Sequence, residues 1–191
     1  EEPRLGAVEG PAVDRRGAQA TQGVAVPLAA VAHVAGEVVP GVLAVEVALW
    51  GEREGIGLLN LIQAPAWVEA IVALILLDFI RYGEHWLLHR VPWLWRLHRV
   101  HHSDVDYDLT VGLRFHPVEA ILANLAVIAA VLALGAPVWA VIASDVATIT
   151  LGHFAHGNVR LPPSVDRAIR TMLVTPAMHS THHSVERDEA T

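Results

Sequence analysis

Cysteine is absent from this 191-residue chain, which excludes both disulfides and thiolate metal sites. Aromatic residues make up only 6% of the chain, and the formal net charge of −7 gives no reason to expect a nucleic-acid partner. Two catalytic motifs are missing as well. Trp86 follows His85, so the chain has no His-Glu-x-x-His pair of a zinc peptidase, and no serine or cysteine sits in a nucleophile elbow.

Aliphatic residues are abundant instead. Hydrophobic residues make up 53% of the chain and the mean hydropathy is +0.43, values typical of a membrane protein. The length fits one domain. Residues 1–23 form a poorly patterned N-terminal segment, and we predict an all-α, multi-pass membrane domain over 24–191. Its four predicted transmembrane helices lie near 24–50, 65–90, 118–134 and 138–156, although the first is equally compatible with an interfacial or re-entrant segment.

The arginines predict the orientation of these helices. If the first span runs outward, 12 of the 13 arginines fall on one side of the membrane. The positive-inside rule assigns that side to the cytoplasm. All the histidine-rich segments fall on the same side, so we expect a cytoplasmic, histidine-rich cap on an integral membrane protein.

Histidine is the most informative residue type. Eight of the twelve histidines form the motifs HWLLH, HRVHH and HSTHH: His85 and His89; His98, His101 and His102; His179, His182 and His183. On a helix, residues i, i+3 and i+4 share one face, so each motif presents its imidazoles in one direction. Imidazole suits borderline transition metals such as iron or zinc. The three motifs therefore predict a site for two metal ions.

Other residues are candidates for the same site. His156 is expected to be a further ligand and His153 an additional one, because both lie where the fourth predicted helix ends. Asp78 precedes His85 by one heptad, so we expect its carboxylate to orient a ligating imidazole, unless it pairs with Arg81 or Tyr82. Four more side chains are expected to support the ligands: Tyr82, Arg114, His116 and Glu119. Trp93 and Trp95 are predicted to be interfacial anchors.

The order of the motifs resembles the fatty acid hydroxylase/sterol desaturase superfamily of membrane di-iron oxygenases. The resemblance covers about residues 65–185 and rests on 78–104, RFHPVE (114–119), HGNVRLP (156–162) and TPAMHSTHHS (175–184). By position, the eight motif histidines match the family's ligands, and His156 and Asn158 match its HxN element. Members usually continue beyond the last motif with an Asn-Tyr-Gly and Trp-Asp-containing segment. Its absence predicts a C-terminally truncated member.

The resemblance implies an oxidoreductase that uses two iron ions and dioxygen on a fatty acyl or sterol-like lipid; zinc could occupy the site in a structure. An apolar chain has no leaving group, so its oxidation requires a metal rather than acid–base side chains. Hydroxylation and desaturation both remain open. A cytochrome or a ferredoxin with its reductase is the expected electron donor. The alternatives are a carotenoid hydroxylase and a non-catalytic metal-binding protein or transporter, although a transporter should hold its ligands near the bilayer midplane.

Overall fold

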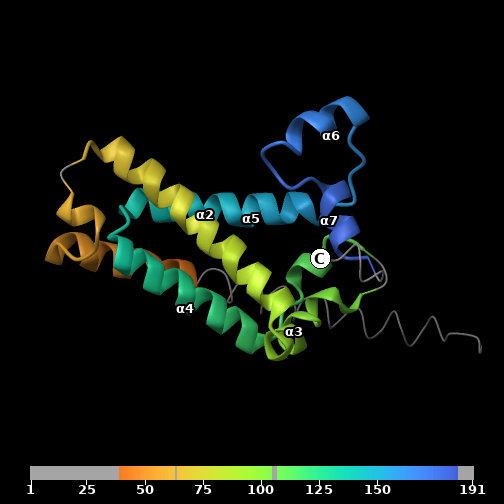
Figure 1. Cartoon of the computed structure of the whole chain (residues 1–191), viewed down its shortest axis with the longest axis horizontal. Helices are drawn as coiled ribbons and strands as arrows, with labels where there is room; N and C mark the ends of the chain where they lie inside the picture. Colours follow the sequence, from red (N-terminus) through yellow and green to blue (C-terminus); the bar gives the residue numbers. More distant parts are fainter. Residues whose placement is uncertain (1–38, 63, 105–106, 185–191) are drawn as a thin grey trace, which may run out of the picture.

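The computed structural model describes residues 39–62, 64–104 and 107–184, and within them the regular structure is entirely helical, as predicted. A helix over 39–54 is followed by η1 (Leu59–Leu61), α2 (Ala66–Arg90), α3 (Pro92–His98), η2 (His101–Ser103), η3 (Val111–Leu113), α4 (Pro117–Leu134), α5 (Val138–Ala155), α6 (Pro163–Ile169) and α7 (Pro176–His182). Helices α2, α4 and α5 run along the molecule, and α3, α6 and α7 lie toward one end (Figure 1). The predicted segment 1–23 and the first part of the predicted helix 24–50 lie outside the described residues.

Local sequence explains where the long helices begin and end. Helix α4 starts at Pro117, and the His116 side chain caps it by accepting a hydrogen bond from the backbone N–H of Val118. It ends at Gly135, whose φ of 65° is the left-handed conformation that favours glycine. Gly57 packs directly against this turn, since a Cβ added to it would lie 2.1 Å from the Gly135 nitrogen. The chain turns here between α4 and α5, at the boundary expected between the predicted helices 118–134 and 138–156.

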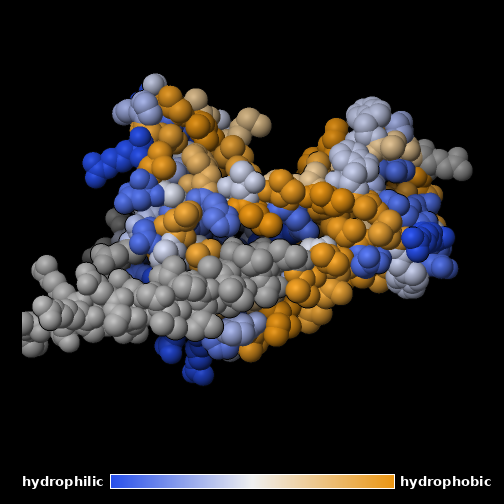
Figure 2. Space-filling model, turned by 180° about the vertical axis from the view of Figure 1, so that it is seen from behind, coloured by the Kyte–Doolittle hydropathy of each residue, from blue (hydrophilic) through white to orange (hydrophobic). Residues whose placement is uncertain are grey.

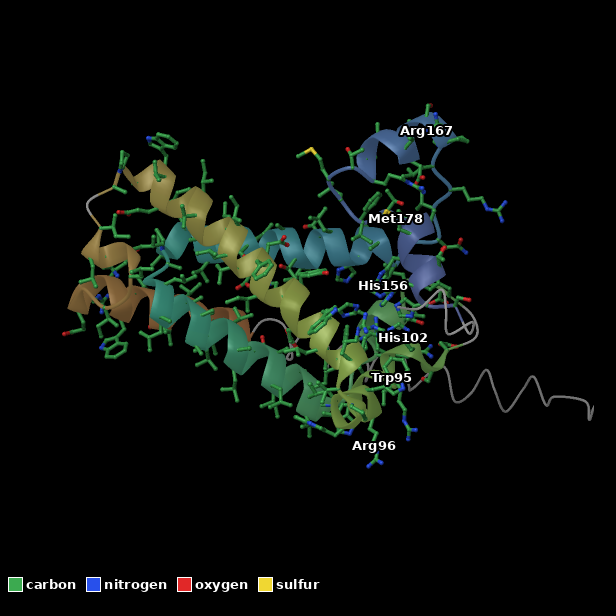
Figure 3. All side chains as sticks on the ribbon, viewed as in Figure 1. Trp95, Arg96, His102, His156, Arg167 and Met178 are labelled. Atoms are coloured by element: carbon green, nitrogen blue, oxygen red, sulfur yellow. The ribbon has the colours of Figure 1, made fainter. Side chains whose placement is uncertain are left out.

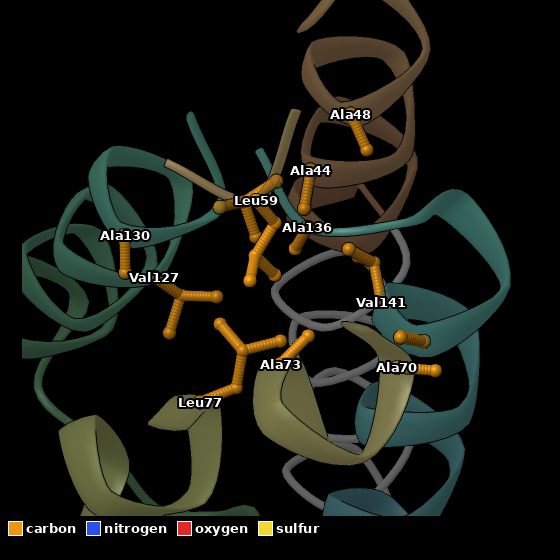
Figure 4. Packing of buried hydrophobic residues seen from close by; sticks show 12 residues of the cluster. Ala44, Ala48, Leu59, Ala70, Ala73, Leu77, Val127, Ala130, Ala136 and Val141 are labelled. Carbon is orange, nitrogen blue, oxygen red and sulfur yellow. The ribbon is translucent and has the colours of Figure 1, made fainter. Parts of the chain in front are cut away.

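The bundle places small residues inside and large ones outside. Ala70, Ala73 and Leu77 of α2 face α4 and α5, where they meet residues such as Val127 and Val141 (Figure 4). The opposite face of α2 exposes a stripe of large apolar side chains at i, i+4 spacing: Trp67, Ile71, Ile75 and Phe79. Helices that associate in lipid pack through small residues and turn large apolar ones outward. Figure 2 shows the resulting broad hydrophobic surface along the bundle.

Fewer membrane spans are found than predicted. Pro117–Leu134 and Val138–Ala155 are each long and apolar enough to cross a bilayer. A third candidate is the pair Val39–Leu61 and Ala66–Arg90, which is bent by 86° at its break and so matches a broken span or a re-entrant segment. The described residues thus hold two or three candidate spans, and four are not confirmed.

A polar pair lies within the bundle, one helical turn from the histidine-rich end. Arg81 of α2 donates a hydrogen bond to Asp145 of α5 over 2.6 Å, and both side chains are half-buried. Asp78, the alternative partner considered for Arg81, is exposed. The charges of Arg81 and Asp145 offset each other in a region where an unpaired ion is costly.

Candidate metal centre

The three histidine motifs meet at one end of the bundle, although they are distant in sequence. HWLLH occupies the last turns of α2, HRVHH runs from the end of α3 into η2, and HSTHH lies on α7. Helix α7 begins at Pro176 because Thr175 caps it, with its hydroxyl accepting from the backbone N–H of Met178. Figure 3 shows His102 and His156 within this gathering of side chains.

Eight imidazoles form two groups of four. In each group, one nitrogen per ring lies within 4.8 Å of the corresponding nitrogens of the other three. One group is His85, His89, His98 and His182; the other is His101, His156, His179 and His183. Each group combines one or more residues from the segment 85–101 with residues of the last histidine motif, which contributes to both groups.

His102 lies between the two groups. Its Nε2 is 3.2 Å from Nε2 of His98 in the first group, and its ring stacks on that of His183 in the second with 4.2 Å between centroids. All nine histidines expected as ligands are therefore brought together at one place. A tenth, His153, lies outside both groups, and its Nδ1 hydrogen-bonds the carbonyl of Ile149.

Hydrogen bonds to oxygen fix the protonation of three rings. Nδ1 of His101 donates to the carbonyl of Val111, and Nδ1 of His156 donates to that of Gly152. Nδ1 of His98 lies 2.6 Å from a carboxylate oxygen of Glu119. A neutral imidazole carries one proton, so a ring that donates from Nδ1 presents a bare Nε2 lone pair. In all three rings this Nε2 faces another imidazole of the centre.

The chemistry of the donors fits metal ions. Nε2 of His89 and Nε2 of His183 are buried without a hydrogen-bond partner, one in each group. Nε2 of His85 lies 3.0 Å from Nε2 of His182, an approach of two basic nitrogens that needs a shared proton or a shared cation. Sites built from imidazole alone suit zinc, copper, iron or nickel. The residues present can thus hold two such ions, one in each group.

Burial lowers the pKa of five of these rings, which favours their neutral form. Outside the long helices, burial and then the neighbouring imidazoles lower the pKa of His179 to about 2 and that of His183 to about 3. The same causes lower the pKa of His101, His102 and His182 below the ordinary value. A metal competes with protons for the imidazole nitrogen, so rings that remain neutral near pH 6 are ready to bind it.

Glu119 is the predicted neighbour that the structure places against a ligand. It lies in the first turn of α4, is only 3% exposed, and accepts from His98. The structure does not place Asp78 against a ligand, because its side chain is exposed and a one-heptad separation on α2 leaves it about 10 Å along the axis from His85. Tyr82 is not at the centre either: it is 64% exposed and its ring packs near Phe79.

The other predicted neighbours have different surroundings. Arg114 forms an ion pair with Asp104 on the surface. His116 caps α4 and lies outside both groups of imidazoles. Asn158 is exposed, beyond the end of α5. None of these three side chains contacts a cluster imidazole through a described hydrogen bond, so their expected support of the ligands is not seen.

Three residues at the centre were not anticipated from the sequence. Tyr107 donates its hydroxyl to the carbonyl of Ala155, and its ring lies 5.4 Å from that of His183. Gly112 contacts His156 so closely that an added Cβ would lie 3.0 Å from the ring. Trp95, predicted to be a membrane anchor, packs 5.2 Å from His89, whereas its neighbour Trp93 is exposed. No sequence signal singled out Tyr107 or Gly112, because both lie in an irregular, polar segment.

Comparisons with known proteins agree with the motifs. The sequence profile of the family described as "Fatty acid hydroxylase" matches residues 70–190. Over 122 residues the chain is 27% identical to "Ornithine lipid hydroxylase OlsE" of Rhizobium tropici, an alignment that covers 64% of this chain and 36% of that protein. The chain thus spans about a third of the length of this curated relative. No solved structure matches significantly. Because the profile covers more than half of the sequence and all nine clustered histidines, the chain belongs to the fatty acid hydroxylase family.

Proposed function

We propose that this protein is a membrane-bound, non-haem di-iron oxidoreductase that uses dioxygen to hydroxylate or desaturate a lipid. One observation carries the proposal: two groups of four buried or half-buried imidazoles lie side by side, joined by His102, at the end of an apolar helical bundle. Family membership supports the same reading.

The chain's own residues perform the supporting work. The carbonyls of Val111 and Gly152 and the carboxylate of Glu119 hold three rings in the tautomer that binds metal. Burial keeps competing protons away. When bound, the iron ions supply the dioxygen activation that an unactivated C–H bond requires, which no side chain of this chain can supply by itself.

A lipid is the substrate class that best fits the surroundings of the site. Large apolar side chains are exposed along α2, α4 and α5, and on α2 they include Trp86 and Leu87 beside the first histidine motif. We propose that an acyl chain in the bilayer approaches the centre along these faces. The relative named for ornithine lipid makes an amino-acid-containing membrane lipid the first substrate to test. We further propose a cytoplasmic active site and a separate electron donor, a cytochrome or a ferredoxin with its reductase.

Reconstitution tests the proposal. The protein is placed in liposomes made from bacterial lipid extract, loaded with iron, supplied with a reductase system and ¹⁸O₂, and the lipids are analysed by mass spectrometry. We expect a lipid that gains one ¹⁸O atom or loses two hydrogens, with no product from His101→Ala and wild-type product from His153→Ala. Unchanged lipid, together with metal movement across the liposome membrane, would support the transporter alternative instead.

A further inference from the structure

Residues 159–174, here called the excursion, leave the metal centre and return to it. The segment begins just after His156 and ends just before α7, whose His179 lies with its Nε2 3.0 Å from Nε2 of His156. Between these fixed ends the chain extends away from the bundle and forms α6 (Figure 1). Arg167 accordingly lies far from His156 in Figure 3.

The excursion has almost no packing of its own. None of the residues of α6 is buried. Five apolar side chains of the segment are exposed, and Met172, at 87%, is the most exposed large apolar residue in the described part of the chain; the others are Val159, Val165, Leu173 and Val174. Apolar side chains gathered in this way mark a surface that another apolar phase covers.

The charge of the excursion identifies that phase. It holds three arginines and one aspartate, a net charge of +2, in a chain whose total is −7. Asp166 pairs with Arg170. Arg160 and Arg167 are exposed and have no acidic partner among the described residues. Exposed arginines beside exposed aliphatic side chains are typical of a segment at the boundary of an anionic bilayer.

The position of the excursion agrees with its chemistry. In Figure 1, α6 stands beside the end of α5 that leads into the metal centre, on the same side of α5 as the beginning of α2. Seen from behind, the molecule is hollowed between the excursion and the beginning of α2, and hydrophobic side chains line the hollow (Figure 2). A bilayer that surrounds α4 and α5 would fill this hollow and meet the excursion at its polar boundary.

We propose that the excursion docks on the surface of an anionic bilayer, with Met172, Leu173 and Val174 among the outer acyl segments and Arg160 and Arg167 at the lipid phosphates. Because both ends of the segment are held at the metal centre, docking fixes the centre at a defined depth beside the lipid. This inference concerns membrane contact alone and does not depend on the proposed reaction.

The absence of cysteine permits a direct test. A spin label is attached to Met172→Cys, and to Ala168→Cys as a second position, in protein reconstituted into vesicles of phosphatidylcholine with phosphatidylglycerol. Collisions with oxygen and with a water-soluble nickel chelate report the depth of each label. Phe79→Cys on the outer face of α2 is the lipid reference, and Glu54→Cys, an exposed position at the other end of the bundle, is the water reference.

We expect the Met172→Cys label to be oxygen-accessible like the Phe79→Cys label and protected from nickel. Each of Arg160→Gln and Arg167→Gln should lower the ratio of docked to undocked excursion about fivefold, the equivalent of about 1 kcal/mol per arginine near an anionic surface. Nickel accessibility equal to that of the Glu54→Cys label at both excursion positions overturns the proposal. The proposal is also overturned if the excursion labels are protected from nickel but show dipolar coupling to labels on a second molecule. That result would assign the surface to a second copy of the chain.

Discussion

The contact between Glu119 and His98 gives the sharpest prediction about the metal centre. The carboxylate is buried, one of its oxygens accepts from His98 Nδ1 over 2.6 Å, and the other has no partner. A hydrogen bond to a charged group contributes roughly 1.5–3 kcal/mol, which corresponds to a factor of about 10–150 in an equilibrium constant. Measured losses at comparable carboxylate–histidine pairs are about 10- to 100-fold in metal affinity.

We therefore expect Glu119→Gln to weaken binding of one of two metal ions by about tenfold, because the amide oxygen still accepts from Nδ1–H but carries no charge. Glu119→Ala should lose about 10- to 100-fold, since the ring also loses its fixed tautomer. The assay is competition between the purified protein and a chelator of known affinity, with iron(II) under anaerobic conditions and with zinc.

Asp78→Asn is the matched control, because it neutralises an exposed carboxylate on α2 that contacts no imidazole in the described structure. Its metal affinity should equal that of the wild type. Equal affinities for Glu119→Gln, Glu119→Ala and the wild type would refute the role assigned to this hydrogen bond. A loss in Asp78→Asn as large as that in Glu119→Ala would show that general charge, and not the contact, controls affinity.

Three further predictions concern pH, packing and the polar pair. Burial lowers the pKa of His101, His179 and His183, so these rings take up protons below about pH 6.5 in the unfolded chain and not in the folded one. The metal-free protein should therefore lose thermal stability as the pH falls from 7 to 5, and a melting temperature that stays constant or rises would contradict this. Gly112→Ala should displace the ring of His156 and lower metal affinity in the same chelator assay. Gly83→Ala is the control and should leave affinity unchanged, because nothing lies within 4 Å of its added Cβ. Asp145→Ala should lower the free energy of unfolding, measured with denaturant, by about 1–3 kcal/mol, because Arg81 loses its partner. The double variant Arg81→Met/Asp145→Leu should recover most of that loss. If it does not, packing and not charge explains the loss.

Sequence periodicity predicted the long helices well because each is defined by local signals. The predicted helix 65–90 is observed as Ala66–Arg90, and Pro117 and Gly135 bound α4 as their backbone preferences require. The first helix was harder to predict, because its glycines and glutamates fit a span and a re-entrant segment equally. The described part, 39–54, belongs to a pair of helices bent by 86°, a geometry that depends on packing around Gly57 and Gly135 rather than on local sequence.

The candidate ligands were predictable, but of the side chains expected to support them only Glu119 contacts a ligand in the described structure. Imidazoles repeated at i, i+3 and i+4 leave a clear pattern, so all nine expected ligands are among those that converge. A supporting carboxylate needs only one contact and leaves no pattern. Counting along α2 therefore selected Asp78, whereas the contact with His98 comes from Glu119 on another helix. Tyr107 and Gly112 lie at the centre because of the path that an irregular segment takes in space, and such a path also leaves no pattern in the sequence.

The division of α7 between the two groups has a consequence for how the protein acquires metal. His182 completes one group, and His179 and His183 complete the other, so neither group exists until the last histidine motif has been synthesised. His85 and His182 are 97 residues apart, an interval of roughly 5–20 s at ordinary rates of translation. During that time the nascent chain offers at most three imidazoles of the first group, a weaker chelator than the finished site. An ion that entered either group would therefore join the segment 85–101 to the last histidine motif, so metal binding would stabilise a contact between parts of the chain that are made at different times.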